Sequence, residues 1–458
     1  MRADYHSTTT DCTVPEPKGQ LVSIFVNFDH PLLQLHRALD WQAIQDLMVL
    51  HWRQHGKNVD GRRGLPWPVS FYVHLLVLKF VQHLDSRQME SYVNENVVAR
   101  LFIGCQEDSK ANIRDHASIA RAEAALGAQG IKALNQLIIK ESVRLGFGKA
   151  QVLSGDTTAQ ELPIGYPNEA GILKGLAQRC LRALTNLQKK GVGYVKQALG
   201  QAKEIIGKVK QYHLFAKTKE QKDQRLKGLV GQSEKLLEKV SEVISRVRVK
   251  GQPVKHGAVE KLRQMQQVGS KLLPQIRYWL KSSKVAKGKL LHAGISQAKA
   301  IVRNKVGKKV EFGLPYLINQ IGGGFVFGEM LSSSPSEAQM PILSLEMYRE
   351  IFGKQAKPQM IVYDRGGGAK ETLRKLKKEK IEKIGVMPRG RGRWRVTGED
   401  RKTVMSERGK MEGSIGTLKS QRYGFHRPKE RKLETLKMAG QRSFLSLNLN
   451  RFLKKLMA

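Results

Sequence analysis

The sequence predicts a mixed α/β protein with an all-helical N-terminal region and a large basic helical insertion. Apolar residues recur every three to four positions from Pro31 to about Gly146, which predicts a series of helices. Strand signals begin near Lys308 and then alternate with helical segments, which predicts a mixed sheet covered by helices. Between these regions, residues 171–310 contain 33 Lys and Arg but only 7 Asp and Glu, at helical apolar spacing. This composition predicts long basic helices.

These changes in pattern divide the chain into four parts. We expect a loose leader at residues 1–28 with one short apolar strand at Leu21–Phe28, a helical domain of four or five helices at 29–148, a sheet domain formed by 149–170 and 306–458, and a basic helical insertion at 171–305. Charge and position favour DNA binding by the helical domain, although a plain packing domain is the alternative. Within the insertion, Gln252–Gly257 is typical of a turn between two helices.

The sheet domain contains a regular series of expected elements. They are a hairpin of Val310–Leu317 and Phe325–Leu331 around Gly322–Gly324, a helix at Ser344–Phe352, a strand at Gln359–Tyr363, a helix at Ala369–Glu379, a strand at Lys383–Met387 and a helical C-terminal stretch at 406–458.

The charge balance indicates a polyanionic partner. The 458 residues include 80 Lys and Arg against 40 Asp and Glu, a formal net charge of +40. Such a chain is attracted to nucleic acid through counterion release, with an anionic membrane as the competing partner. We find no long apolar run for a membrane span, no secretory signal, and three scattered cysteines that fit neither a disulfide framework nor a zinc spacing. We therefore expect a soluble intracellular protein that binds nucleic acid and no membrane.

Three acidic residues have informative surroundings. Asp156 closes the apolar run Val152–Asp156, and Asp364 closes a second run at Met360–Asp364. Sites form where strands of α/β sheets end, and carboxylates are ligands for hard divalent cations. The glycines at 366–368 would allow close approach to the backbone. The alternative for each aspartate is an ordinary cap of a turn or helix.

A third carboxylate, Glu412, lies in a predicted helix with two basic residues. Arg408 and Lys419 stand four residues before it and seven after it, so the three side chains share one helix face. The Arg408–Glu412 spacing also suits a simple surface ion pair, worth a few tenths of a kcal/mol.

This combination resembles the DDE transposases of bacterial insertion sequences, which have a ribonuclease-H-like catalytic domain. The resemblance rests on Arg408-x3-Glu412-x6-Lys419, on Asp156-Thr157-Thr158 and on Tyr363-Asp364-Arg365-Gly366. The family signature also has a tyrosine three residues before the arginine, where this chain has Met405. Three N-terminal motifs are similar to the same elements: Asp29–Leu33, Leu39–Trp41 and Gly61–Pro66.

The resemblance implies an enzyme of DNA transposition and recombination. It assigns catalysis and binding of two Mg²⁺ ions, with Mn²⁺ as a substitute, to Asp156, Asp364 and Glu412. It assigns DNA contacts to Arg365, Arg408 and Lys419, and the Arg/Gly loop that contains Arg391 and Arg393 is expected to contact DNA beside the site. The expected reaction is cleavage at the ends of the transposable element and strand transfer of the 3′-hydroxyl into double-stranded target DNA. A homodimer on DNA and a bacterial cytoplasmic, nucleoid-associated location are also implied.

Two other functions remain open at the level of sequence. One is a non-catalytic basic protein that binds nucleic acid, with the three acids as structural caps; the Arg/Gly run at 389–395 would suit RNA. The other is a ribonuclease-H-like nuclease that cuts without strand transfer.

Overall fold

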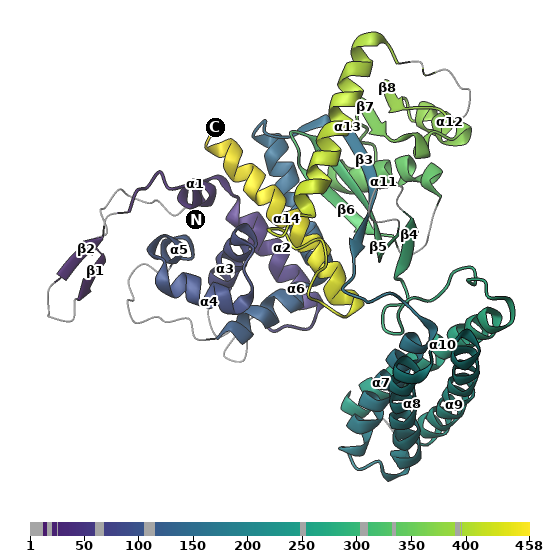
Figure 1. The fold of residues 1–458 in the computed structure, drawn as a ribbon. Coiled ribbons are helices and arrows are strands. Elements are labelled where there is room, and N and C mark those ends of the chain that lie inside the picture. Colours follow the sequence, from purple (N-terminus) through teal and green to yellow (C-terminus); the bar gives the residue numbers. More distant parts are fainter. Residues whose placement is uncertain are drawn as a thin grey trace. The chain divides into compact units, whose positions relative to one another are not determined.

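The computed structural model describes residues 12–15, 21–24, 26–59, 68–104, 115–247, 253–302, 310–331, 336–389, 394 and 396–458 (Figure 1). The chain divides into two compact units. Unit 1 contains Met1–Thr158, Tyr316–His426 and Glu434–Ala458, and unit 2 contains Ala159–Pro315 and Arg427–Leu433. The mixed α/β class predicted from the sequence is confirmed.

The N-terminal part of unit 1 is helical, as expected, and the described residues contain six helices rather than four or five. They are α1 (Pro31–Ala38), α2 (Trp41–Gln54), α3 (Val69–Gln82), α4 (Ser86–Glu95), α5 (Val97–Phe102) and α6 (His116–Arg144). The sequence pattern undercounts them because only one or two residues, including a capping residue, can separate two helices. Asp40 accepts a hydrogen bond from the Ala43 amide at 3.1 Å between α1 and α2, and Asn96 separates α4 from α5.

Of two N-terminal features predicted from the sequence, the structure describes the strand in the leader but not the Gly61–Pro66 motif. The expected strand at Leu21–Phe28 is shorter, because β2 covers Leu21–Ile24 and pairs antiparallel with β1 (Cys12–Pro15). The leader therefore contains a two-stranded hairpin. The Gly61–Pro66 motif lies outside the described residues.

The main sheet has the strand order β4-β5-β3-β7-β8, with β6 paired to β5. Its strands are β3 (Lys149–Glu161), β4 (Lys299–Val302), β5 (Val310–Gly322), β6 (Val326–Met330), β7 (Met360–Tyr363) and β8 (Lys383–Val386). β6 and β4 are antiparallel to β5, whereas β3, β7 and β8 run parallel to one another. The expected hairpin at 310–331 and the strands at 359–363 and 383–387 are confirmed, each within a few residues.

Within unit 1, the two faces of the sheet pack against different helices (Figure 1). Leu153 and Ile361 point into a large hydrophobic cluster with α6 and α11 (Met340–Phe352), while Met360 and Val362 pack on Val404 of α13 (Gly398–Leu418). The expected helix at 369–379 is α12 (Lys370–Lys378). The expected C-terminal helical stretch consists of α13 and α14 (Leu433–Leu456), which are separate helices.

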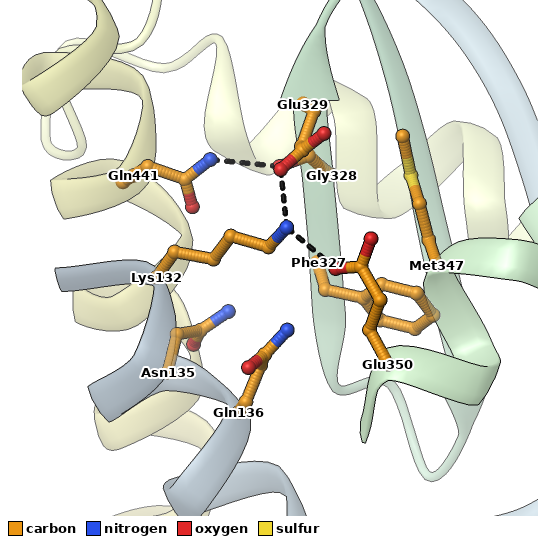
Figure 2. Close-up of a pocket in the computed structure, with 9 residues that line it drawn as sticks. All are labelled: Lys132, Asn135, Gln136, Phe327, Gly328, Glu329, Met347, Glu350 and Gln441. Carbon is orange, nitrogen blue, oxygen red and sulfur yellow. Dashed lines mark hydrogen bonds and ion pairs between the residues drawn. The ribbon is translucent and has the colours of Figure 1, made fainter. Parts of the chain in front are cut away.

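Polar residues from four of these elements line a hollow on unit 1 and contact one another (Figure 2). Lys132 of α6 contacts Glu329 of β6 and Glu350 of α11, and Gln441 of α14 donates to the Gly328 carbonyl at 2.8 Å. Burial alone would lower the pKa of Lys132, but its hydrogen bonds to the two glutamates raise it. Because Lys132 is paired with both glutamates, the hollow is a structural junction.

Unit 2 is a bundle of four long helices with its own hydrophobic core. The helices are α7 (Glu169–Gln188), α8 (Lys196–Phe215), α9 (Lys219–Arg246) and α10 (Pro253–Ser282), with the 3₁₀ turn η1 (Gly193–Val195) before α8. The turn expected at Gln252–Gly257 is wrong in its position, because α10 begins at Pro253. Proline suits the first turn of a helix, where an amide hydrogen bond is not required. Cys180 lies in this core, where burial raises the pKa of its thiol to about 12.

In the described part of the chain, no helix combines the length and the apolar character needed to cross a membrane.

Candidate active site

Asp156 of β3 lies beside Asp364, the residue that directly follows the neighbouring parallel strand β7 in unit 1. The strand register pairs Ser154 of β3 with Val362 of β7, and both aspartates lie two residues further along. Neighbouring strands are about 4.8 Å apart, and residues two apart on a strand point to the same face. Because Val152, Met360 and Val362 belong to the cluster that contains Val404, both carboxylates lie toward the face that α13 covers. The register thus brings together two of the acidic residues that the sequence singled out.

Asp156 does not lie at a strand end, contrary to the sequence prediction. Strand β3 continues to Glu161, although its partner β7 stops at Tyr363. The extension is paired on its other side by β5, since Gly313 of β5 packs directly on Gln160 and Leu162 donates to the Phe312 carbonyl at 3.0 Å. Asp156 thus stands at the point where one of its two neighbouring strands ends.

The Asp364 side chain has an oxygen atom that the described part of the chain leaves unsatisfied. Its Oδ1 atom is buried and has no hydrogen-bond partner among the described residues. The Asp156 Oδ1 atom accepts the Thr157 amide at 2.7 Å. Two half-buried carboxylates, one with an unsatisfied oxygen, fit a hard divalent cation, which takes oxygen ligands.

The negative charges of Asp156 and Asp364 affect the pKa of Tyr363. Burial raises the pKa of its phenol far above the usual range, and the negative charges of Asp156 and Asp364 raise it further. Its ring packs against Gly155, where a Cβ atom would lie 2.8 Å from both Asn319 Oδ1 and Ser344 Oγ. Gly155 is therefore fixed by packing behind the site.

The glycines after Asp364 serve packing between protein segments. A Cβ atom on Gly368 would overlap the Met387 carbonyl, and one on Gly367 would lie 2.6 Å from the Pro341 ring. The Arg389 amide donates to the Gly368 carbonyl at 3.0 Å. The loop that follows Asp364, including the 3₁₀ turn η3 (Arg365–Gly367), is thus held against the segment after β8. Close approach of a ligand is not needed to explain these glycines.

Glu412 lies on the predicted helix but apart from the aspartate pair. The inward face of α13 is formed by Val404, Glu407, Met411, Ser414 and Leu418. Glu412 is 67% exposed, and its Oε1 atom lies 3.8 Å from Nη2 of Arg408. Among the described residues, no group of three or more His, Cys, Asp and Glu side chains is close enough to hold a metal ion. In this conformation Glu412 therefore does not complete a three-carboxylate site.

The predicted basic residues have different locations. Arg408 and Lys419 are half-buried on the same side of α13 as Glu412, as the spacing predicted, and Arg365 is exposed in η3. Arg391 and Arg393 lie outside the described residues.

Glu337 is a further acidic residue near the site that the sequence did not indicate. It lies in the 3₁₀ turn η2 (Glu337–Gln339), which precedes α11. A Cβ atom on Gly366 would overlap Glu337 Oε2 and lie 2.9 Å from Asp364 Oδ1, so the two carboxylates are neighbours. No local pattern distinguishes this glutamate, because only the packing of η2 on η3 brings it there.

One of three comparisons with known proteins gives a match. Residues 22–124 match the family model described as Transposase domain (DUF772). This segment is similar to a transposase domain. It covers α1–α5, the first turns of α6 and the Asp29–Leu33 motif, so the resemblance to transposases is confirmed at this level. No curated protein and no solved structure matches the chain.

Proposed function

We propose that this chain is a DNA transposase that cuts the ends of an insertion sequence and joins the 3′-hydroxyl to target DNA. One observation carries the proposal: Asp156 of β3 lies beside Asp364, which directly follows the parallel strand β7, in a chain whose residues 22–124 match a transposase domain. Antiparallel β6 and β5 lie next to β3, which is followed by the parallel strands β7 and β8, and this order supports the ribonuclease-H-like fold that the resemblance implies.

The aspartates would hold Mg²⁺ or Mn²⁺ through their carboxylate oxygens. When bound, two such ions activate the attacking oxygen and stabilise the leaving oxygen of a phosphodiester. The resemblance assigns the third carboxylate to Glu412, which would join the pair only in another conformation, after it leaves Arg408. Arg365, Arg408 and Lys419, together with Arg391 and Arg393, would neutralise phosphates of the DNA beside the scissile bond.

A strand-cleavage assay with the full-length chain tests this proposal. The substrate is the DNA that flanks the gene, with Mg²⁺ present. We expect Asp156→Asn or Asp364→Asn to lower cleavage by about a thousand-fold or more, because the ions lose a charged ligand, while DNA affinity changes less than about two-fold. Glu399→Gln is the matched control, since Glu399 is an exposed acid on α13. Cleavage that persists in either aspartate variant would contradict the assigned site.

The exposed position of Glu412 favours one alternative, a basic protein that binds nucleic acid without cutting it. Metal-dependent cleavage by the wild-type chain would exclude this alternative. A strand-transfer assay with a labelled, pre-cut end separates a transposase from a nuclease, since only the transposase joins the label to a target plasmid.

A further inference from the structure

A row of basic residues on α7 is distinct from the other charged groups of unit 2. Arg179, Arg182 and the C-cap residue Lys189, with the neutral Asn186 before Lys189, follow one another at intervals of three and four residues, so they lie along one side of the helix. After Glu169, α7 contains no acidic residue. The row therefore presents donors and positive charge without a neutralising carboxylate on the same helix.

Packing against a second segment holds the Arg179 side chain in place within this row. Its guanidinium lies directly over Gly294, where any Cβ atom would overlap it. The approach of this segment to α7 is close, because a Cβ atom on Gly175 would lie 3.6 Å from the Ala293 side chain. The guanidinium is thus fixed between the helix and the segment 292–294, and it is half-buried.

Arg179 has no anionic partner in the described part of the chain. Burial lowers the pKa of its guanidinium, and the positive charge of Arg182 lowers it further. Burial and the charge of Arg179 also lower the pKa of His292. Other arginines of the bundle are paired with acids: Arg277 contacts Glu234, and Arg263 lies 3.6 Å from Glu260. A half-buried arginine next to a second arginine is unfavourable without an anion.

We propose that Arg179 and Arg182, supported by Gly294, form a site for a backbone phosphate of double-stranded DNA, and that Asn186 and Lys189 continue the contact along α7. The fixed, planar guanidinium of Arg179 suits bidentate binding of a phosphate. The row along the helix suits successive phosphates of one strand, and DNA is the polyanion that the proposed function, on which this inference rests, requires. Unit 2 then contributes to holding the DNA while unit 1 carries the aspartate pair.

Binding of a short DNA duplex to the full-length chain, measured without divalent ions over a range of salt concentrations, tests the site. In Arg179→Ala/Arg182→Ala, two phosphate contacts are lost, so the slope of log affinity against log salt should fall by about two and affinity by about ten-fold. The matched control, Arg263→Ala/Arg277→Ala, removes the same charge from acid-paired arginines and should change the slope by less than half as much.

A second pair of variants tests the geometry without changing the charge. Gly294→Ala displaces the Arg179 guanidinium and should weaken binding several-fold, whereas Gly200→Ala adds a methyl group where no atom lies within 4 Å and should have no effect. Circular dichroism confirms that each variant is folded.

The outcomes separate this inference from the proposed function. An unchanged salt slope in the double arginine variant overturns the phosphate site, even if the wild-type chain cleaves DNA. A loss seen only with an RNA duplex reassigns the row to RNA and also overturns it. Failure of the wild-type chain to bind DNA at all would overturn both.

Discussion

At the scale of single residues, His36 and His74 are two groups whose charge state is set by packing. Their rings are stacked with centroids 5.0 Å apart, and the Trp41 ring lies 4.1 Å from that of His74. Burial is the main cause that lowers the pKa of each imidazole from 6.5 to about 4, and for His36 the charge of His74 adds to it. Both are therefore neutral in the folded protein at neutral pH.

This pair predicts a loss of stability in mild acid. The unfolded chain binds a proton on each histidine below pH 6.5, whereas the folded chain does so only near pH 4, so the unfolded state binds more protons between these values. The free energy of unfolding should fall as pH is lowered from about 6.5 to about 4, by on the order of 2 kcal/mol for each histidine. Urea unfolding monitored by circular dichroism at a series of pH values measures it.

Two variants test whether the stacked histidines cause this pH dependence. His74→Gln removes one titrating group and should flatten the dependence between pH 6.5 and 4. His213→Gln, on an exposed histidine of α8, should leave it as in the wild-type chain. An identical pH dependence in all three proteins would show that the stacked pair does not control it.

The residues of the candidate site differ in how far the sequence could locate them. The juxtaposition of Asp156 and Asp364 was predictable, because each follows a run of apolar residues that forms a buried parallel strand. The position of Glu337 was not, because it depends on two 3₁₀ turns that pack together from distant parts of the chain. Spacing placed Glu412, Arg408 and Lys419 on one helix face, but it could not give the distance of that face from the aspartates.

At the scale of elements, three helices of unit 1 meet at one buried carboxylate. Glu123 of α6 contacts Lys79 of α3 at 2.7 Å and Arg442 of α14 at 2.8 Å. Lys79 is only 2% exposed and Glu123 only 6%. Burial alone would raise the pKa of Glu123, but the charges of Arg442 and Lys79 hold it below the usual value. The cluster joins a helix near the N-terminus to the C-terminal helix.

Removal of the central charge should weaken this junction. In Glu123→Gln, the buried Lys79 and the half-buried Arg442 lose their counter-charge, which costs about 3–5 kcal/mol. The midpoint of urea unfolding should fall accordingly. Glu141→Gln is the matched control on the same helix, because Glu141 pairs with the exposed Arg144, and its effect should stay below about 0.5 kcal/mol. Equal shifts in both variants would contradict a special role for the buried cluster.

The elements themselves were largely predictable, and the exceptions have physical causes. The spacing of apolar residues predicted the positions of β7, β8, α11 and α12 within a few residues. Each of these elements has regular apolar spacing and ends near a change in the local sequence pattern. The extension of β3 past Asp156 was not predictable, because it depends on pairing with β5, more than a hundred residues away in the chain. The start of α10 was misplaced because Pro253 is equally suited to a turn and to a first helical turn.

At the scale of the whole molecule, the net charge of +40 controls association. Two copies of so basic a chain repel each other, and the phosphates of bound DNA neutralise part of that charge. We therefore expect one chain per particle in the free protein and two chains per particle on DNA that contains the element end. Light scattering after size-exclusion chromatography measures both states.

The substrate for this comparison should be varied together with the salt. A duplex of unrelated sequence and equal length carries the same phosphate charge, so it controls for non-specific loading. A pair of chains that forms only on end DNA, and that dissociates as added salt screens the phosphates, would support a dimer organised by the two ends. A single chain on end DNA at every salt concentration would contradict the expected homodimer, because one chain with one aspartate pair cannot process two ends at the same time.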